Sequence, residues 1–167
     1  MIANVMSGES FKYNFLMYNR FFSLRLNLLM KLILAFLCKD FFLVAVVGAS
    51  ALKGGGVGTS EVMALIHPVF FLADFPAITV AYAAIVRRPE SKILPRMIWK
   101  KGRELILLST TIYTTLVIFR RDWDLLSLSW ADWIAISINI FIIFYIMKSE
   151  YVSDLFNDFP IPKPTGA

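Results

Sequence analysis

The side chains best suited to chemistry are ionisable residues set inside two long apolar stretches. Lys39 and Asp40 lie near the middle of the first stretch, residues 26–52. Asp74 lies near the middle of the second, residues 62–86. Ammonium and carboxylate groups in apolar surroundings can form ion pairs or take part in proton and ion transfer. These residues are therefore the first candidates for a functional site.

The elements that must hold these residues are membrane helices. About 20 consecutive apolar residues cross a bilayer, and residues 100–119 and 128–147 supply two more stretches of that length. The chain has 167 residues, of which 58% are hydrophobic and 17% charged, which is more apolar surface than a soluble domain of this size can bury. The sequence predicts an all-α integral membrane four-helix bundle with short loops and spans at about 26–52, 62–86, 100–119 and 128–147.

Two flanking segments complete the predicted domain organisation. Residues 1–25 form an N-terminal segment whose aromatic residues at helical spacing suit an interfacial amphipathic helix and a partly ordered tail equally. Residues 148–167 form a polar C-terminal tail with a proline-rich run at residues 160–164. Such a run can dock as an extended strand, but a solvated end is the favoured interpretation.

The distribution of cations predicts the orientation in the membrane. Three Lys and Arg residues lie in residues 1–25, seven in residues 87–103 and two in residues 148–167, whereas only three lie on the opposite side. Since Lys and Arg accumulate on the cytoplasmic side, both termini are predicted to be cytoplasmic. All four tryptophans fall at the ends of predicted spans, where membrane proteins concentrate them.

The charges in the first two spans are predicted to pair. Lys39 lies thirteen residues before the end of its span and Asp74 lies twelve after the start of the next, so an antiparallel hairpin places both at a similar depth. Because an unpaired charge at the bilayer centre costs about 2.5–3.5 kcal/mol or more, we expect an ion pair between them. Asp40 points about 100° away from Lys39 and needs its own partner or protonation, with Asn139 and the hydroxyls of residues 109–111 as candidates.

One further titratable group shares a helix face with Asp74. His67 stands seven positions before Asp74, about two helical turns away. A structural polar cluster that fixes helix register is the favoured interpretation, and a pathway for protons or ions is the alternative. The candidate intramembrane polar cluster consists of Lys39, Asp40, His67, Asp74 and Asn139.

A basic segment is the candidate for lipid contact. Residues 87–103 carry seven cations and one acidic residue, Glu90. A net charge of +5 would suggest nucleic acid for a soluble protein, but cations beside membrane spans are typical of contacts to anionic lipid headgroups. The ring of Trp99 suits the depth of the headgroups. The predicted headgroup contacts are Arg87, Arg88, Lys92, Arg96, Trp99, Lys100, Lys101 and Arg103, and no nucleic acid partner is expected.

The sequence lacks motifs for catalysis and for cofactor binding. One His and one Cys, Cys38, lack the spacing of metal ligands, and neither G-x-S-x-G nor H-E-x-x-H occurs. The glycine-rich residues 54–58 are followed by Thr59 without the Lys of a phosphate-binding loop, so they are interpreted as a connection between spans. Asp122 and Asp124 resemble the D-x-D metal motif of glycosyl transferases, which is weak evidence in a short loop. We therefore expect no enzyme activity, no metal and no cofactor.

Several short motifs resemble one known family. They are Leu65, Ile66, His67 and Pro68; Phe75 and Pro76; Arg87, Arg88 and Pro89; residues 98–103; and the segment from Ser149, Glu150 and Tyr151 to Asp158, Phe159 and Pro160. Their order and spacing over residues 26–160 are similar to those of small bacterial inner-membrane proteins of the YfeZ type, a domain of unknown function. The resemblance implies a multi-pass protein of the bacterial inner membrane. It implies no activity and no catalytic residues.

The expected function is that of a subunit. Alanines recur every four residues at positions 73, 77 and 81 and at positions 45 and 49, and such faces let helices approach closely in lipid. This pattern predicts a non-catalytic accessory or scaffold subunit of a larger membrane complex, which binds another integral membrane protein or self-associates. The alternative is a small transporter or a proton- or ion-conducting oligomer that uses Lys39, Asp40, Asp74 and His67.

Overall fold

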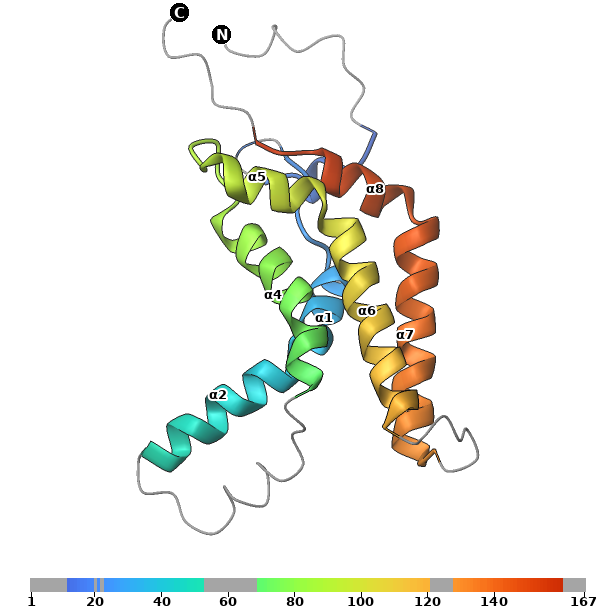
Figure 1. Cartoon of the computed structure of the whole chain (residues 1–167). Helices are drawn as coiled ribbons and strands as arrows, with labels where there is room; N and C mark the ends of the chain where they lie inside the picture. Colours follow the sequence, from blue (N-terminus) through green and yellow to red (C-terminus); the bar gives the residue numbers. More distant parts are fainter. Residues whose placement is uncertain (1–11, 20, 22, 53–68, 121–127, 161–167) are drawn as a thin grey trace, which may run out of the picture.

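The computed structural model describes residues 12–19, 21, 23–52, 69–120 and 128–160, and this part of the chain is mostly helical (Figure 1). The described elements are the 3-10 helix η1 (Phe15–Met17) and the α-helices α1 (Leu28–Leu37), α2 (Lys39–Leu52), α4 (Phe70–Val86), α5 (Ile93–Lys100), α6 (Gly102–Phe119), α7 (Trp130–Lys148) and α8 (Glu150–Asn157). These residues form no β-strand, only an isolated bridge between Tyr18 and Leu24. The predicted all-α class is confirmed.

Three long helices form the body of the molecule, with α6 packed against both α4 and α7 (Figure 1). On α4, Ala73 and Ala77 are buried, with 1% and 0% of their surface exposed. The Ser109 hydroxyl on α6 donates a hydrogen bond to the Ala73 carbonyl oxygen at 2.6 Å. Small side chains permit such a close approach between two helix backbones. The alanine face of α4 is therefore used inside the chain.

Local sequence signals set several helix starts. Before α7, the Ser129 hydroxyl accepts a hydrogen bond from the Asp132 amide at 3.2 Å, and the Asp132 carboxylate accepts one from the Ser129 amide at 3.0 Å. This reciprocal capping box satisfies two amides that a helix start leaves free. Before α1, the Asn27 side-chain oxygen accepts a hydrogen bond from the Met30 amide at 2.8 Å. Each cap limits how far the apolar run can extend as a helix.

Two helices, α6 and α7, are long and apolar enough to cross a membrane. The α1–α2 pair meets the same criterion as one bent span, and α4 is apolar but shorter. The predicted spans at about 100–119 and 128–147 thus coincide with single helices. The predicted span at 62–86 begins outside the described residues, so the complete four-helix bundle stays a prediction.

The first predicted span, residues 26–52, is not one straight helix. The backbone leaves helical geometry at Cys38, with φ −101° and ψ 12°, and the axis of α2 is bent by 64° from that of α1. Hydropathy averages over such a break, which is why the sequence predicts a single span. In Figure 1, α2 points away from the body formed by α4, α6 and α7, and its main contacts are with α1 and α4.

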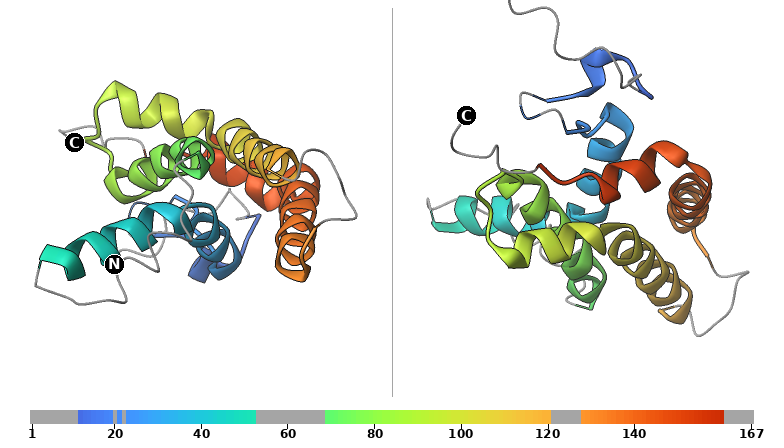
Figure 2. Two further views of the ribbon diagram at one scale, coloured as in Figure 1. Left: turned by 60° about the horizontal axis from the view of Figure 1, so that its bottom comes forward. Right: turned by 90° about the horizontal axis from the view of Figure 1, so that it is seen from above.

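One end of the long helices is covered by α5, α8 and the described residues between 12 and 27 (Figure 2). Together with Arg87 and Asp158, which are hydrogen-bonded to Leu24, these residues are called the end layer. The described part of the N-terminal segment contains η1 and turns, not a long amphipathic helix, and residues 1–11 lie outside it. The side chain of Asn19 explains one of these turns. Its oxygen accepts hydrogen bonds from the amides of Phe21 and Ser23, which competes with helix formation.

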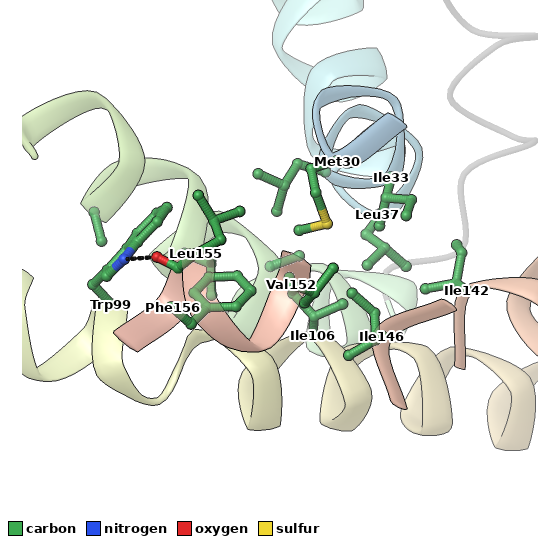
Figure 3. Packing of buried hydrophobic residues seen from close by; sticks show 14 of the residues in the cluster. Met30, Ile33, Leu37, Trp99, Ile106, Ile142, Ile146, Val152, Leu155 and Phe156 are labelled. Carbon is green, nitrogen blue, oxygen red and sulfur yellow. Dashed lines mark hydrogen bonds between the residues drawn. The ribbon is translucent and has the colours of Figure 1, made fainter. Parts of the chain in front are cut away.

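The main core lies where the end layer meets the long helices (Figure 3). Its members with at most 3% exposure include Met30, Ile33 and Leu37 of α1, Ile106 of α6, Ile142 and Ile146 of α7, and Val152, Leu155 and Phe156 of α8. The first eight residues after Ser149 were predicted as part of a polar tail, but they form α8 and contribute to this core. Mean hydropathy does not reveal such a helix, because only one face is apolar. Residues 161–167, with most of the proline-rich run, lie outside the described part.

Candidate functional site

The intramembrane charges pair differently from the sequence prediction. Lys39 Nζ lies 3.1 Å from Asp40 Oδ2, so the two adjacent residues form the ion pair. The ammonium also lies 3.7 Å from the ring centroid of Tyr113 on α6, a cation–π contact. The predicted ion pair between Lys39 and Asp74 is wrong. Its premise was a straight first span, and the break at Cys38 changes the direction in which both charged side chains leave the backbone.

Asp74 has a structural partner instead. Its Oδ2 accepts a hydrogen bond from the backbone amide of Phe41 at 2.8 Å. Phe41 lies in the first turn of α2, where backbone amides have no partner within the helix. A carboxylate at that position also faces the positive end of the helix dipole. Asp74, which is 1% exposed, therefore caps the helix start that the break at Cys38 creates.

Among the described residues, three buried side-chain oxygens have no hydrogen-bond partner: Ser23 Oγ, Asp74 Oδ1 on α4 and Asn139 Oδ1 on α7. The last two belong to the predicted intramembrane cluster. The amide nitrogen of Asn139 donates to the Ala135 carbonyl oxygen at 2.8 Å, within its own helix. No described contact joins Asn139 to Asp40 or Asp74. A buried oxygen without a hydrogen-bond donor lowers the free energy of unfolding. Packing alone therefore does not explain why polar residues occupy positions 74 and 139.

The other candidate partners for Asp40 are occupied elsewhere. The Ser109 hydroxyl donates to α4, and the hydroxyls of Thr110 and Thr111 donate to carbonyl oxygens one turn earlier in α6, at 2.7 and 2.8 Å. His67 lies outside the described residues. Within the described part of the chain, no group of three or more His, Cys, Asp or Glu side chains is placed to hold a metal ion. The described polar residues thus form separate contacts, not one continuous network.

The end layer contains a second polar centre around Arg87, which is 8% exposed. Its Nη1 donates to the Leu24 carbonyl oxygen at 2.6 Å, and its Nη2 donates to the Asp158 carbonyl oxygen. The Asp158 carboxylate lies 3.8 Å from the same guanidinium and accepts a hydrogen bond from the Leu24 amide. Burial lowers the pKa of Arg87 to about 10, while the charge of Asp158 opposes this shift. Arg87 therefore joins three segments that are distant in sequence.

Trp99 lies beside Arg87 and is fully buried. Its indole nitrogen donates to the Leu155 carbonyl oxygen at 2.9 Å, as Figure 3 shows, and its ring centroid lies 4.9 Å from that of Phe156. The Arg87 guanidinium lies 4.4 Å from the centroid of the Trp99 ring. Gly102 is also required here, because an added Cβ would meet the Phe156 ring at 2.3 Å.

The prediction that Arg87 and Trp99 contact lipid headgroups is therefore wrong. Both side chains face inward, because α8 packs over the segment that was predicted to be a basic loop. No signal near either residue could indicate this, since their partners lie 56 to 71 positions away.

The other six predicted headgroup contacts are exposed or partly exposed. Three are also engaged: Arg96 donates to the Pro89 carbonyl oxygen, Arg103 to that of Met147, and Lys101 pairs with Glu104 at 3.0 Å. Among the described residues, the side chains of Arg88, Lys92 and Lys100 make no ion pair. These three cations are the ones most available to an anionic ligand.

One more contact in the end layer was not anticipated from the sequence. Lys12 and Tyr13 both donate to Asp154 Oδ2, at 2.7 and 2.6 Å. The hydrogen bond from Lys12, followed by that from Tyr13, lowers the pKa of Asp154, and the same contact raises the pKa of Lys12. The contact joins the first described residues to α8, near the other end of the chain.

Comparison with known proteins gives the extent of the shared domain. The chain matches the family described as "Protein of unknown function (DUF2919)" over residues 13–158. This region begins and ends with residues that meet in the end layer, where Tyr13 contacts Asp154 and Leu24 contacts Asp158. Searches among curated proteins and among solved structures found no match. Because the match covers most of its length, the chain belongs to the DUF2919 family of proteins of unknown function.

Proposed function

We propose that the chain is a non-catalytic integral membrane protein of the bacterial inner membrane, of the YfeZ type, and that it serves as an accessory or scaffold subunit of a larger membrane complex. Four segments cross the membrane in this proposal, and both termini are cytoplasmic. The observation that carries it is the position of α2, which bends 64° from α1 and exposes apolar side chains.

The outer surface of the helices supports insertion into a membrane. Large apolar side chains on several helices are exposed, among them Phe75 at 66%, Ile85 at 80%, Trp130 at 85% and Phe144 at 62%. Soluble monomers rarely expose contiguous apolar surface on this scale. In a bilayer the same side chains face lipid at no such cost. Resistance of the native protein to alkaline extraction of its membrane is the result expected from insertion, and release into the soluble fraction would contradict it.

The difference between two alanine faces supports the role of a subunit. Ala73 and Ala77 of α4 are already covered inside the chain. Ala45 and Ala49 of α2 are exposed, and Phe42 beside them is 56% exposed. Small exposed residues let a second helix approach closely in lipid. The face of α2 around Ala45 is thus available to another membrane protein or to a second copy of this chain.

Capture of the tagged protein from its native membrane in mild detergent, followed by mass spectrometry, tests the proposal. We expect a stoichiometric partner with the unchanged protein and its loss with Ala45→Phe, because a large ring at Ala45 prevents close helix approach. Ile140→Phe is the matched control: it enlarges a side chain that is 48% exposed on α7 and should leave the partner bound.

Two results of this capture would contradict the proposal. If no stoichiometric partner, including a second copy, accompanies the unchanged protein, it is not a stable subunit. If Ile140→Phe releases the partner and Ala45→Phe does not, the partner binds α7 and the proposed role of α2 is wrong.

The alternative function is a small transporter or a proton- or ion-conducting oligomer that uses Lys39, Asp40, Asp74 and His67. The specific observation in its favour is the pair of buried oxygens, Asp74 Oδ1 and Asn139 Oδ1, that accept no hydrogen bond from described residues. Buried acceptors without donors are suited to transient binding of a proton or a cation.

Two substitutions of Asp74 separate the functions. Asp74→Asn keeps an oxygen that can accept the hydrogen bond from the Phe41 amide but cannot ionise, whereas Asp74→Leu removes both properties. A subunit should tolerate Asp74→Asn and lose its partner with Asp74→Leu. A conductor should show pH-dependent flux in liposomes that Asp74→Asn abolishes, and such a flux would refute the non-catalytic subunit.

A further inference from the structure

A groove of about 700 Å³ lies between the last turns of α4 and the start of α5. Its apolar wall includes Tyr82, Ile85 and Leu94, which are 50%, 80% and 62% exposed. Its polar rim carries Arg88, Glu90 and Lys92. One side of the groove is therefore apolar and the other has a net positive charge, which is the distribution expected for an amphipathic anion.

The turn that carries the two cations is held by its own hydrogen bonds. The Ser91 hydroxyl accepts from the Arg88 amide at 2.9 Å and donates to the Val86 carbonyl oxygen, and the Ser91 amide donates to the Arg88 carbonyl oxygen at 3.0 Å. The side chains of Arg88 and Lys92 make no ion pair among the described residues. The backbone is thus ordered while both cationic groups remain available, an arrangement that limits the entropy lost when a ligand binds.

A second, apolar groove of about 330 Å³ adjoins the first and lies between α1 and α4. The two grooves share Ile85, and Leu34, Ala81 and Ala84 line the second one. Its lining runs from Leu26, just before α1, to Cys38, just after it, and the ten residues of α1 alone span about 15 Å at 1.5 Å per residue. A single extended acyl chain fits such a groove in length and in chemistry.

We propose that an anionic phospholipid of the membrane binds this surface, with its phosphate on Arg88 and Lys92 and its acyl chains in the grooves on either side of Ile85. Charge selects the occupant: the two cations outnumber Glu90 at the rim, and juxtamembrane Lys and Arg attract anionic headgroups. Apolar area selects it as well, because a soluble anion would leave Ile85 and Leu94 uncovered. Binding at this position would also hold α5 against α4.

This inference rests on the membrane insertion in the proposed function but not on the proposed partner. A stoichiometric partner without lipid binding would therefore refute the inference alone, and lipid binding without any partner would refute the subunit alone.

Thermal unfolding of the purified full-length protein in mild detergent tests the lipid site. We expect added phosphatidylglycerol to raise the midpoint temperature by at least about 2 °C, since a ligand that binds only the folded state stabilises it. Phosphatidylcholine and inorganic phosphate should not produce this increase. An equal increase with phosphatidylcholine would show that charge plays no part, and an equal increase with phosphate would show a soluble-anion site; either would overturn the proposal.

Two double variants remove the same charge from different places. Arg88→Gln with Lys92→Gln should lose the increase caused by phosphatidylglycerol, whereas Lys100→Gln with Lys101→Gln should keep it, because neither of these lysines lines the groove. Equal loss in both variants would indicate general attraction to the basic segment and would overturn the site. If the first variant shows no cooperative unfolding, Leu94→Trp tests the site instead. The larger ring fills the groove, leaves all charges in place and should reduce the increase in midpoint temperature caused by phosphatidylglycerol.

Discussion

The end layer and the break at Cys38 differ in the contacts that hold them in place. In the end layer, Arg87 and Trp99 are buried and donate hydrogen bonds to backbone carbonyl oxygens of two distant segments, one at Leu24 and one at the end of α8. At the break, the described contacts include the hydrogen bond from the Phe41 amide to Asp74, which links α2 to α4, and the contact of Lys39 with the Tyr113 ring of α6. The end layer connects segments that are distant in sequence, whereas the break at Cys38 leaves α2 with much of its surface exposed.

The difference indicates a division of roles within the molecule. A region in which buried side chains such as Arg87 and Trp99 donate to distant backbone carbonyl oxygens can move only if several contacts break together, so it resists local opening. A helix held mainly by one cap and by packing along one side can change its angle at a smaller cost. The end layer is therefore the rigid part of the molecule, and α2 is the part best able to adapt to a partner.

The largest expected effect compares two aromatic residues. Trp99→Ala should lower the free energy of unfolding by about 3–5 kcal/mol, because it leaves a cavity between α5, α6 and α8. Phe42→Ala on α2 should change it by less than about 1 kcal/mol, since the ring is 56% exposed. Thermal unfolding in detergent measures both. Similar losses for the two variants would show that the end layer is no more stable than α2.

The next effect compares two adjacent arginines. Arg87→Met leaves the carbonyl oxygens of Leu24 and Asp158 without their donor, which should lower the free energy of unfolding by about 1–3 kcal/mol for each. The methionine side chain should keep the contact with Trp99. Arg88→Met, measured without anionic lipid, should be nearly neutral because Arg88 is exposed. Unfolding midpoints in the same detergent decide the matter, and a larger loss for Arg88→Met would reverse the assignment of roles.

The smallest effect concerns the exposed contact between Lys12, Tyr13 and Asp154. Because these hydrogen bonds lower the pKa of Asp154 below its usual 3.8, the contact stabilises the end layer above that pH and is lost as the pH falls through the folded-state pKa. Asp154→Asn should therefore speed amide hydrogen exchange in residues 13–18 at pH 6 and have less effect near pH 3, after correction for intrinsic rates. An unchanged exchange rate at pH 6 would show that Asp154 does not hold the segment.

Comparison of particular residues shows how far the sequence could predict this structure. The helices over residues 102–119 and 130–148 follow from long apolar runs, and the buried face of Ala73 and Ala77 follows from their spacing. The pairing of Lys39 with Asp74 failed because the prediction assumed one straight helix across Cys38. A helix break of this kind leaves the average hydropathy unchanged, so a window of about twenty residues does not detect it.

The helical class, the positions of the apolar helices and the concentration of cations between α4 and α6 can be read from the sequence, because these depend on local composition and period. Three features required the packed fold: Arg87 is buried while Arg88 is exposed, Asp74 caps α2, and α8 completes the core. Each of these depends on contacts between residues 33 to 71 positions apart. Such contacts form only when the whole chain has packed, and no local pattern encodes them.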